Sequence, residues 1–501
     1  MSEPLIYELS VPGRCGVDMP APDVPETELP RDLMRDGLGL PELSQLDVVR
    51  HYLHLSQMNY SIDGGFYPLG SCTMKFNSKI NEDVARLPGF AFTHPLQDPM
   101  TVQGNLAILY LLQEWLKEIG GFAGVSLQPA AGAHGEFAGI LMMRAYHRDR
   151  GEAKRTKILI PDSAHGTNPA STSMGGLSVV QLPSDSRGNI DLESLRAACD
   201  ESVVGLMLTN PNTLGLFEEH IEEVIDLVHD CGGLMYGDGA NMNALTGVAR
   251  PGDLGFDVMH FNLHKTFSTP HGGGGPGSGP VGVSEKLVDY LPGPIVGVEY
   301  PDEGDETPAY VPVTPQKSIG RMRAFYGNAG MFFRAYTYIR VHGPAGLLAN
   351  AQHAVLNANY LRVRLHDKYR VPYDRINMHE FVCQGKFAGS DVRALDVSKR
   401  LMDYGYHPPT NYFPLIVPEA LMIEPTETES KQTLDGFIDA MRKIADEAVS
   451  QPELLHAAPH HAPVKRLDEV KAARELVLCC MPVEFAERAA ASSSTSTRDH
   501  V

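Results

Sequence analysis

The chain has 501 residues, enough for two or three domains with a sizeable hydrophobic core. Hydrophobic residues make up 43% and charged residues 21%, as is usual for a globular chain, and the net charge is −20. This charge argues against nucleic acid or an anionic membrane surface as the main partner. Apolar runs break off within a few residues, so we also expect no membrane span.

The N-terminal segment and the cysteines indicate a cytoplasmic protein. The opening sequence MSEPLIYELSVPGRC lacks the basic and apolar segments of a secretory signal. The 7 cysteines are scattered, without a Cys-x-x-Cys pair or a His/Cys spacing typical of metal sites. This pattern predicts reduced thiols, no disulfide framework and no bound metal.

Residues 1–95 are predicted to form an N-terminal arm. They are rich in Pro and Leu, with one helical stretch at 43–57 and turn-forming residues through 61–77. Arms of this kind usually wrap a neighbouring subunit or lobe. The alternative is a disordered leader, which the apolar content of the segment disfavours.

Between residues 96 and 330, predicted helices and strands alternate. The alternation predicts an open α/β fold, with a mostly parallel sheet and helices on both faces. The helix that opens this region ends at a Gly-Gly pair, which is a helix stop. The expected helices are 105–120, 135–148, 191–199 and 218–231. The expected strands are 125–128, 156–161, 177–182, 203–210, 233–238 and 257–262.

The remaining chain is predicted to form a smaller domain and an extension. A helical stretch begins at residue 329, and a mixed segment follows it. We expect a large cofactor-binding domain at 96–330, a small α+β domain at 331–455 and an extension at 456–501. The tail after residue 485 is of low complexity and is expected to be disordered.

Several predicted strands end in residues that suit a binding site. Ligands of open α/β sheets bind beyond the carboxyl ends of the strands. A turn with Gly132 and Gly135 opens a helix, where free amides favour phosphate. His165 and Asn212 each follow an apolar strand. Each signal alone is weak, because small residues also serve packing and Asn also shapes turns.

Asp238 ends one further apolar strand, Lys265 follows another, and together they make the pattern specific. Each alone would be an ordinary turn residue or a solvated cap. Behind a phosphate-binding turn and a histidine, they describe a site for pyridoxal 5'-phosphate, which needs a lysine for a Schiff base and an acid at its pyridine nitrogen. A carboxylate there keeps that nitrogen protonated, so that the ring acts as an electron sink.

Five segments resemble the glycine dehydrogenase (decarboxylating) family, the P-protein of the glycine cleavage system. They are YPLGSCTMKFN, AHGTNPAS, DGANMNA, NLHKTFSTPHGGGGPG and HPPTNYFPLIVPEALMIEPTETES. The resemblance extends over roughly residues 1–450. Fused P-proteins are about twice as long as this chain, which therefore resembles subunit 2 of the split form, the C-terminal half with the cofactor lysine.

The resemblance implies a type I pyridoxal-phosphate-dependent transferase fold and a role for each matched position. Lys265 would form the Schiff base, Asp238 would pair with the pyridinium nitrogen, and His165 would stack on the ring. Further groups would hold the phosphate and the ring hydroxyl: Gly132, Ala133, His134, His264 and Asn212. Arg321 and Arg323 would face a phosphate, a partner subunit or solvent.

The family resemblance also implies a reaction and partners. Glycine would lose CO2, and the aminomethyl group would pass to the lipoyl arm of H-protein, in a heterotetramer with P-protein subunit 1. The glycine-rich run 272–279 would either open a channel for this arm or pack tightly beneath the cofactor. The candidates to guide or protonate the lipoyl sulfur are His134, His264 and His271.

Two other interpretations of the function remain open. One is a different type I enzyme, such as a group II amino-acid decarboxylase or an aldolase, against which the IVPEALMIEPTETES segment argues. The other is a cofactor-free structural half, like the N-terminal half of fused P-proteins, against which Lys265 and Asp238 together argue.

Overall fold

The chain is divided into two units, residues 1–64 with 458–501 and residues 65–457. The structure, a computed structural model, describes residues 3–34, 39–271, 276–300 and 308–476. The tail predicted to be disordered and Cys479–Cys480 lie outside these residues. The domain boundaries expected at 95, 330 and 455 stay a prediction.

The first unit contains the predicted arm helix. Helix α1 (Gln45–Gln57) begins with a capping box, in which Ser44 and Asp47 satisfy each other's backbone amides. The unit also holds η1 (Arg31–Leu33) and α14 (Glu469–Arg474). The helix expected at 43–57 is thereby confirmed.

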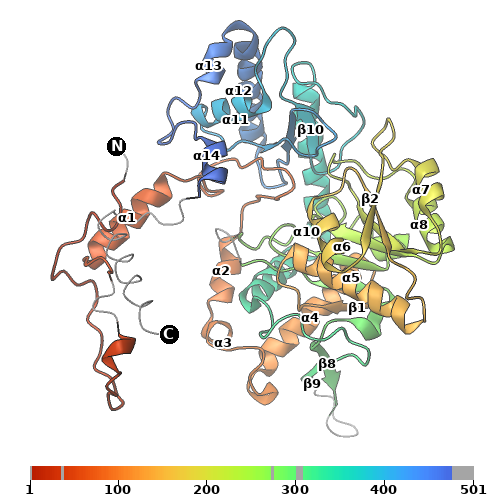
Figure 1. Ribbon diagram of the computed structural model, residues 1–501, viewed down its shortest axis with the longest axis horizontal. Coiled ribbons are helices and arrows are strands. Elements are labelled where there is room, and N and C mark those ends of the chain that lie inside the picture. The colour runs from red at the N-terminus through yellow and green to blue at the C-terminus, as the bar shows by residue number, and fades with distance from the viewer. Residues whose placement is uncertain (1–2, 35–38, 272–275, 301–307, 477–501) are drawn as a thin grey trace, which may run out of the picture. The chain divides into compact units, whose positions relative to one another are not determined.

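The second unit is built on a seven-stranded sheet with the order β1-β7-β6-β5-β4-β2-β3 (Figure 1). Strands β6, β5, β4, β2 and β3 run parallel to one another, whereas β7 is antiparallel to both β6 and β1. The sheet is therefore mostly parallel, as the sequence predicts. Its strands are β1 (Gly124–Ser126), β2 (Lys157–Pro161), β3 (Ser178–Leu182), β4 (Val203–Thr209), β5 (Leu234–Gly239), β6 (Val258–Phe261) and β7 (Val281–Val283).

Helices cover both faces of this sheet, which is why its central strands are continuous apolar runs. Helix α5 (Gly132–Asp149) packs on one face, over a core that includes Met207 and Tyr236. Helices α4 (Gln103–Gly120) and α8 (Ile221–Asp230) contribute to a second core with Leu206 and Met235. Because neighbouring residues of a strand point to opposite faces, Leu206 and Met207 belong to different cores.

Shorter elements surround the large sheet. The helices are α2 (Lys79–Ala85), α3 (Pro88–Ala91), η2 (Pro99–Thr101), α6 (Thr167–Met174), α7 (Leu192–Ala198), α9 (Pro251–Leu254) and η3 (Glu285–Tyr290). Strands β8 (Ile295–Glu299) and β9 (Ala309–Val313) form a separate antiparallel pair.

A long helix leads from the large sheet to a smaller one. Helix α10 (Ala329–Leu365) is interrupted at Gly343, whose φ of 61° leaves the helical region, and Pro344 follows it. Beyond α10, the small sheet has the order β10-β12-β11, all antiparallel. Its strands are β10 (Phe381–Gln384), β11 (Thr410–Asn411) and β12 (Ala420–Ile423).

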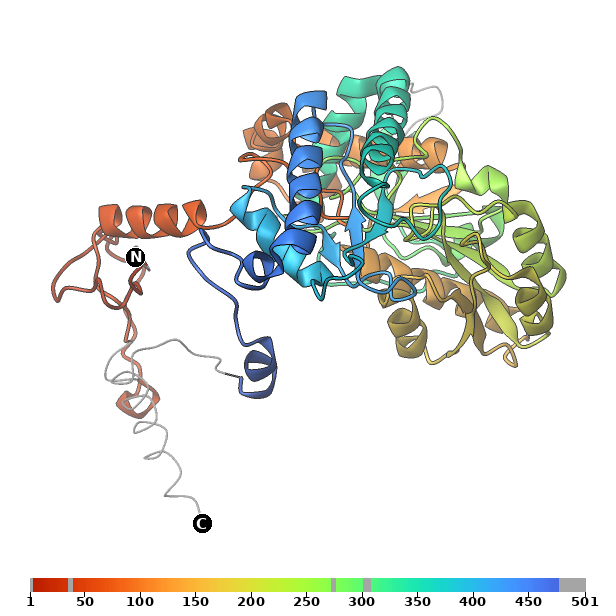
Figure 2. The ribbon, with the colours of Figure 1, turned by 90° about the horizontal axis from the view of Figure 1, so that it is seen from above.

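Three helices pack with the small sheet around a core of their own. They are α11 (Ala394–Asp403), α12 (Lys431–Ser450) and α13 (Pro452–His456). Helix α12, blue in Figure 2, also packs against α10, drawn in teal. This α+β arrangement agrees with the smaller component of the predicted fold class.

Two structural features bear on the site and on the membrane prediction. The segment that carries the YPLGSCTMKFN motif lies along the small sheet, because Leu69 pairs with Ile423 and the Gly70 amide donates to the Met422 carbonyl at 3.3 Å. Across the described residues, no helix is long and apolar enough to cross a bilayer.

Candidate active site

A cavity of about 220 Å³ opens beyond the carboxyl ends of β4, β5 and β6. Six of the eight predicted site residues line it: Lys265, Asp238, His165, Gly132, Ala133 and His264. They come from four separate segments, which the strands of the large sheet bring to one edge. The wall is completed by residues that the sequence did not point to, among them Ser71, Glu136, His379 and Glu380.

Asp238 is a buried carboxylate held in its charged form. Its oxygens accept hydrogen bonds from Asn168 Nδ2 at 3.1 Å and from the Ala240 amide at 3.0 Å, and His260 Nε2 lies 3.5 Å away. Burial alone would raise its pKa, but His260, these hydrogen bonds and Lys265 outweigh it, so that the pKa lies below its usual value. The cavity therefore has a fixed negative charge at this end.

The Lys265 side chain is available for chemistry. It follows β6 on a turn that the Asn262 carbonyl stabilises by accepting from the Lys265 amide at 3.1 Å. Among the residues that the structure describes, its ammonium has neither a hydrogen bond nor an ion pair. A lysine that lines a cavity without a partner can form a covalent bond with a ligand there.

The other end of the cavity is the N-terminus of α5. Its N-cap, Ala131, offers no side-chain acceptor, so the first amides of this 18-residue helix stay available to an anion. A Cβ on Gly132 would lie 2.8 Å from Asn262 Oδ1, and one on Gly279 would lie 2.1 Å from the Ala131 carbonyl oxygen. Both positions therefore suit glycine, because backbone and side chains approach closely there.

Gly279, which approaches Ala131 closely, belongs to the glycine-rich run 272–279. Its described part, residues 276–279, packs against the start of α5, since a Cβ on Gly277 would also lie 3.0 Å from the Ala130 carbonyl oxygen. For this part, tight packing is the interpretation that the contacts favour. Residues 272–275, on which the channel interpretation depends, lie outside the described residues.

His165 lies on the wall of the cavity as a neutral imidazole. Its Nδ1 is 2.9 Å from Thr167 Oγ1, and its ring meets the edge of Phe413 at 5.5 Å between centroids. Burial lowers its pKa; the carboxylate of Asp238 opposes the shift and the ammonium of Lys265 adds to it. A neutral, half-buried ring of this kind suits contact with a flat aromatic ligand.

Two predicted residues do not line the cavity. Asn212 is engaged in its own turn, where Oδ1 accepts from the amides of Leu214 and Leu216 and Nδ2 donates to the Gly188 carbonyl at 2.9 Å. His134 is instead contacted by Arg323, whose Nη2 lies 2.7 Å from the imidazole Nδ1. The contact places Arg323 next to the start of α5, which fits the phosphate alternative for this residue.

A carboxyl group behind Asp238 was missed by the sequence analysis. Glu136 accepts from Thr167 Oγ1 at 2.7 Å and from Asn168 Nδ2 at 3.0 Å, and this Asn also binds Asp238. Burial and the nearby Asp238 raise the pKa of Glu136. Since Glu136 lies in the GAHGEFAG turn already singled out, its position one helical turn into α5 was the available signal.

The second missed group lies on the small-sheet side. Glu380 lines the cavity just before β10, and Glu424 follows β12. With His379 they form a buried cluster whose ligand-type atoms all lie within 4.8 Å of one another. Nothing in the spacing of 380 and 424 predicts their meeting, because antiparallel pairing of β10 with β12 brings it about.

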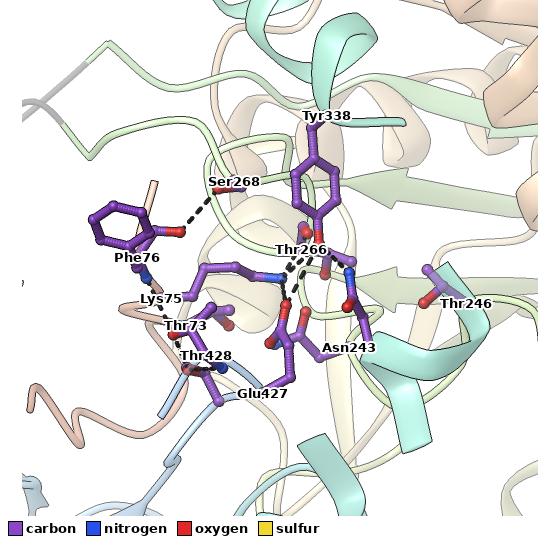
Figure 3. Close-up of polar contacts among 12 residues, drawn as sticks. Thr73, Lys75, Phe76, Asn243, Thr246, Thr266, Ser268, Tyr338, Glu427 and Thr428 are labelled. Carbon is purple, nitrogen blue, oxygen red and sulfur yellow. Dashed lines mark hydrogen bonds and ion pairs between the residues drawn. The ribbon is translucent and has the colours of Figure 1, made fainter. Parts of the chain in front are cut away.

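A buried ion pair supports the loop that carries Lys265 (Figure 3). Lys75 Nζ donates to Glu427 Oε1 at 2.6 Å and to the Thr266 carbonyl at 2.8 Å, and Tyr338 Oη lies 3.4 Å away. The Lys75 side chain is 2% exposed and that of Glu427 6%. The pair connects three distant segments directly beside the residue after Lys265.

The donor set fits pyridoxal 5'-phosphate. The cavity offers a free lysine, a buried carboxylate and uncapped helix amides, which are the three groups that this cofactor needs. Two residues that line the cavity have buried polar atoms without a hydrogen-bond partner among the described residues: Thr209 Oγ1 and Asn262 Oδ1. Buried atoms of this kind normally have a partner, which a polar ligand would supply.

Comparison with known proteins agrees with this arrangement. Residues 350–462 match the protein family described as glycine dehydrogenase, C-terminal domain. A probable glycine dehydrogenase (decarboxylating) subunit 2 of Alkaliphilus oremlandii is 56% identical over 95% of this chain and 97% of its own. The protein of the same name from Pyrococcus horikoshii is 54% identical over 95% of both chains.

Solved structures of lower identity share the fold. A glycine decarboxylase (P-protein) of the glycine cleavage system, in inhibitor-bound form, superimposes with a TM-score of 0.70 at 20% identity, over 83% of this chain and 93% of its own. Glutamate decarboxylase of Lactobacillus brevis gives 0.61 at 13% identity, over 86% and 96%. These likenesses confirm the predicted fold class, that of type I pyridoxal-phosphate-dependent enzymes.

Proposed function

Because the chain belongs to the glycine dehydrogenase (decarboxylating) subunit 2 family, we propose that it binds pyridoxal 5'-phosphate and decarboxylates glycine. In this proposal the aminomethyl group passes to the lipoyl arm of H-protein, and P-protein subunit 1 completes the enzyme. The match covers 97% of the relative from Alkaliphilus oremlandii and 99% of the one from Chloroherpeton thalassium.

One observation carries the proposal: Lys265, Asp238 and the start of α5 meet in a single cavity. The same observation disfavours a cofactor-free half, which would need neither the free lysine nor the buried carboxylate. The family membership disfavours the other type I enzymes, since those of known structure share only the fold with this chain.

The residues divide the binding work along the cavity. The amides of Gly132 and Ala133 would hold the phosphate at the positive end of α5, and Lys265 would hold the cofactor covalently. Asp238 would keep a proton on the pyridine nitrogen. When bound, pyridoxal 5'-phosphate supplies a conjugated ring that accepts the electron pair of a breaking bond.

The remaining wall would orient and enclose the substrate. His165, neutral and half-buried, would cover one face of the bound ring and keep water from it. Lys265 contributes the only ammonium or guanidinium group among the described residues that line the cavity. A glycine carboxylate placed away from Lys265 would therefore have no cationic partner, and loss of CO2 would remove a charge that is poorly stabilised there.

Exchange of labelled bicarbonate into glycine tests this function. The purified chain, loaded with pyridoxal 5'-phosphate and mixed with subunit 1 and lipoylated H-protein, is expected to incorporate the label into the glycine carboxyl group. Omission of H-protein or subunit 1 should reduce the incorporation strongly, because both belong to the proposed enzyme.

Larger amino acids provide the matching control. Glutamate, alanine and serine should lose no CO2 under the same conditions. Decarboxylation of one of them, with no exchange into glycine, would overturn the proposal in favour of another type I decarboxylase.

A further inference from the structure

We propose that Glu380 is the acid that protonates the sulfur atom released when the lipoyl disulfide is opened. The inference rests on the proposed function and assigns a residue to a step for which the sequence suggested only histidines.

Glu380 reaches the cavity from the small sheet. Glu380 immediately precedes β10 of the small sheet, whereas Asp238 lies in β5 of the large sheet. The residue is only 4% exposed, and its Oε2 accepts a hydrogen bond from the Ser71 amide at 2.8 Å. Since Ser71, Glu380 and Lys265 all line the cavity, the Glu380 carboxyl group can reach a ligand held there.

Glu424 makes Glu380 the protonated member of a pair. Glu424 is fully buried and accepts from Thr73 N at 3.1 Å, from Thr73 Oγ1 at 2.8 Å and from Asn241 Nδ2 at 2.8 Å. Among the described residues, the Ser71 amide is the one hydrogen-bond donor to Glu380. Two adjacent buried carboxyl groups do not both ionise, and the group with more donors holds the charge. The proton therefore resides on Glu380.

The backbone is shaped to keep this pair in place. Ser71 and Thr73 have positive φ values of 68° and 50°, although neither residue is glycine. In this conformation the Ser71 amide faces Glu380 and the Thr73 amide faces Glu424. Left-handed conformations of non-glycine residues cost free energy and gather at functional sites. The segment that resembles the family motif thus supports both carboxyl groups.

The other ionisable groups on the wall do not offer a suitable proton. Burial lowers the pKa of His264 and of His379 to about 3 each, and Lys265 adds to both shifts, so both rings are neutral. His165 is also shifted toward the neutral form, and Asp238 is ionised. Neutral imidazoles accept protons, so none of these groups can donate one at neutral pH.

Glu136 and Lys265 also line the cavity, but each has another role. Glu136 lies at the Asp238 end of the cavity, where Thr167, Asn168 and Ser171 occupy its oxygens. Lys265 is assigned to the cofactor. His260, which also lines the cavity, faces Tyr236 Oη at 2.6 Å and Asp238 at 3.5 Å. Glu380 is therefore the acid on the described part of the wall whose proton is free to transfer.

The step balances with one proton per turnover. The electron pair left by CO2 forms the bond between the glycine-derived carbon and one lipoyl sulfur, and the S–S bond breaks. The second sulfur departs with the S–S electron pair as a thiolate and takes the Glu380 proton to become a thiol. Glu380 then regains a proton from solvent before the next turnover, so no oxidant or reductant is needed.

The pH dependence follows from the charged neighbours of Glu380. Burial raises its pKa well above the ordinary value, Glu424 raises it further, and Lys265 opposes the shift. The other titratable groups that face the pair are His379, which is neutral, and Cys72, whose own pKa is raised by burial. The acid form is required, so transfer is expected at pH values below the raised pKa and is lost as pH rises through it.

The test uses the loaded complex with subunit 1 and a single turnover onto lipoylated H-protein. Glu380→Gln keeps the size of the side chain but removes the proton, and we expect a transfer rate lower by roughly 10²–10⁴-fold. Glycine binding, followed by the cofactor absorbance, should persist, and Glu380→Asp should restore part of the rate. Glu218→Gln, at a buried glutamate outside the cavity, should leave transfer unchanged.

A second measurement reports the proton itself. The infrared spectrum of the wild-type complex should contain a band of a buried protonated carboxyl group that disappears on raising the pH and is absent from Glu380→Gln. The alkaline limit of the transfer rate should coincide with the loss of this band.

The two proposals fail in different ways. A wild-type complex that transfers nothing to H-protein would overturn the proposed function. A wild-type complex that transfers normally, with Glu380→Gln equally fast, would overturn the assignment of Glu380 alone. So would a divalent metal ion found at one per chain and lost on Glu380→Gln, because the cluster would then hold a cation in place of the proton.

Discussion

Gly132 shows how one missing side chain shapes the candidate site. Its Cα faces the Asn262 amide so closely that a Cβ would lie 2.8 Å from Oδ1 and 2.9 Å from Nδ2. Asn262 precedes Lys265 by one turn, so a displacement here would reach both ends of the cavity. The glycine is therefore required by packing as well as by the proposed phosphate site.

We predict that Gly132→Ala weakens cofactor binding by about tenfold or more, because it displaces Asn262 and the first amides of α5. The measurement is a titration with pyridoxal 5'-phosphate followed by absorbance. Gly104→Ala is the matched control, since a Cβ there meets nothing within 4 Å and the residue also lies in a helix. Equal affinities of the two variants would contradict the placement of the phosphate.

Asp238 is the residue on which the proposed electron sink depends. We predict that Asp238→Asn lowers bicarbonate exchange by about 10²–10³-fold, since the amide keeps the Ala240 hydrogen bond but loses the charge. Asp257→Asn removes a buried carboxylate of the same strand pair outside the cavity and should keep the exchange activity of the folded protein. A normal rate in Asp238→Asn would show that ring protonation does not need this residue.

At this scale, the residues that follow parallel strands were predictable and their partners were not. Asp238 and Lys265 could be found because one lies at the end of an apolar strand and the other lies shortly after the next strand. Asn212 follows β4 in the same way, yet its amide is used up by local turn bonds that sequence spacing does not reveal. Glu380 and Glu424 meet only through the small sheet.

Among the elements, the loop after β6 depends on contacts from far along the chain. The Lys75–Glu427 pair holds the Thr266 carbonyl, and both residues lie in segments that resemble family motifs. Burial alone would lower the pKa of Lys75, but Glu427 and Tyr338 outweigh it and raise the pKa, so the ammonium stays charged. The pair connects the loop after β6 of the large sheet with the segment before α2 and the segment after β12.

We predict that Lys75→Met destabilises the protein by about 3–5 kcal/mol, because it leaves Glu427 charged and buried without its partner. Adding Glu427→Gln should recover part of this loss, since the uncompensated charge is removed. Thermal unfolding of the two variants and the wild type measures both effects. If Lys75→Met alone were as stable as the wild type, the ion pair would not support the loop.

The helices and strands of the large domain were predicted better than those around it. Continuous apolar runs identify buried parallel strands, and β2, β4 and β5 lie where the sequence indicates. Helix α6 was not predicted, because its sequence TNPASTSM has no apolar periodicity and the helix packs on α5 and β3. Strand β7, only 3 residues long, lacked a recognisable pattern.

For the whole molecule, the length of the chain and its exposed apolar residues point to a partner. Large apolar side chains of the arm are exposed, including Val17, Met19 and Leu33 at 69%, 80% and 76%. Exposed apolar surface of this extent is typical of interaction surfaces. The chain spans nearly the full length of relatives that are themselves called subunit 2, so the proposed enzyme needs a second chain.

We predict that the chain and subunit 1 form a complex with two copies of each, which native mass spectrometry of the mixture would detect. Shortening the arm should weaken this complex, since the exposed apolar residues would be lost. A chain that stays separate from subunit 1 at every concentration, yet exchanges bicarbonate alone, would contradict the heterotetramer.

The chemical identity of the cofactor lysine can be tested directly. Borohydride reduction of the protein loaded with pyridoxal 5'-phosphate, followed by peptide mapping, is expected to place the reduced cofactor on the peptide with Lys265. Lys265→Ala should abolish this labelling while the protein stays folded. Labelling at another lysine, or a folded wild-type chain that takes up no cofactor, would contradict the central claim.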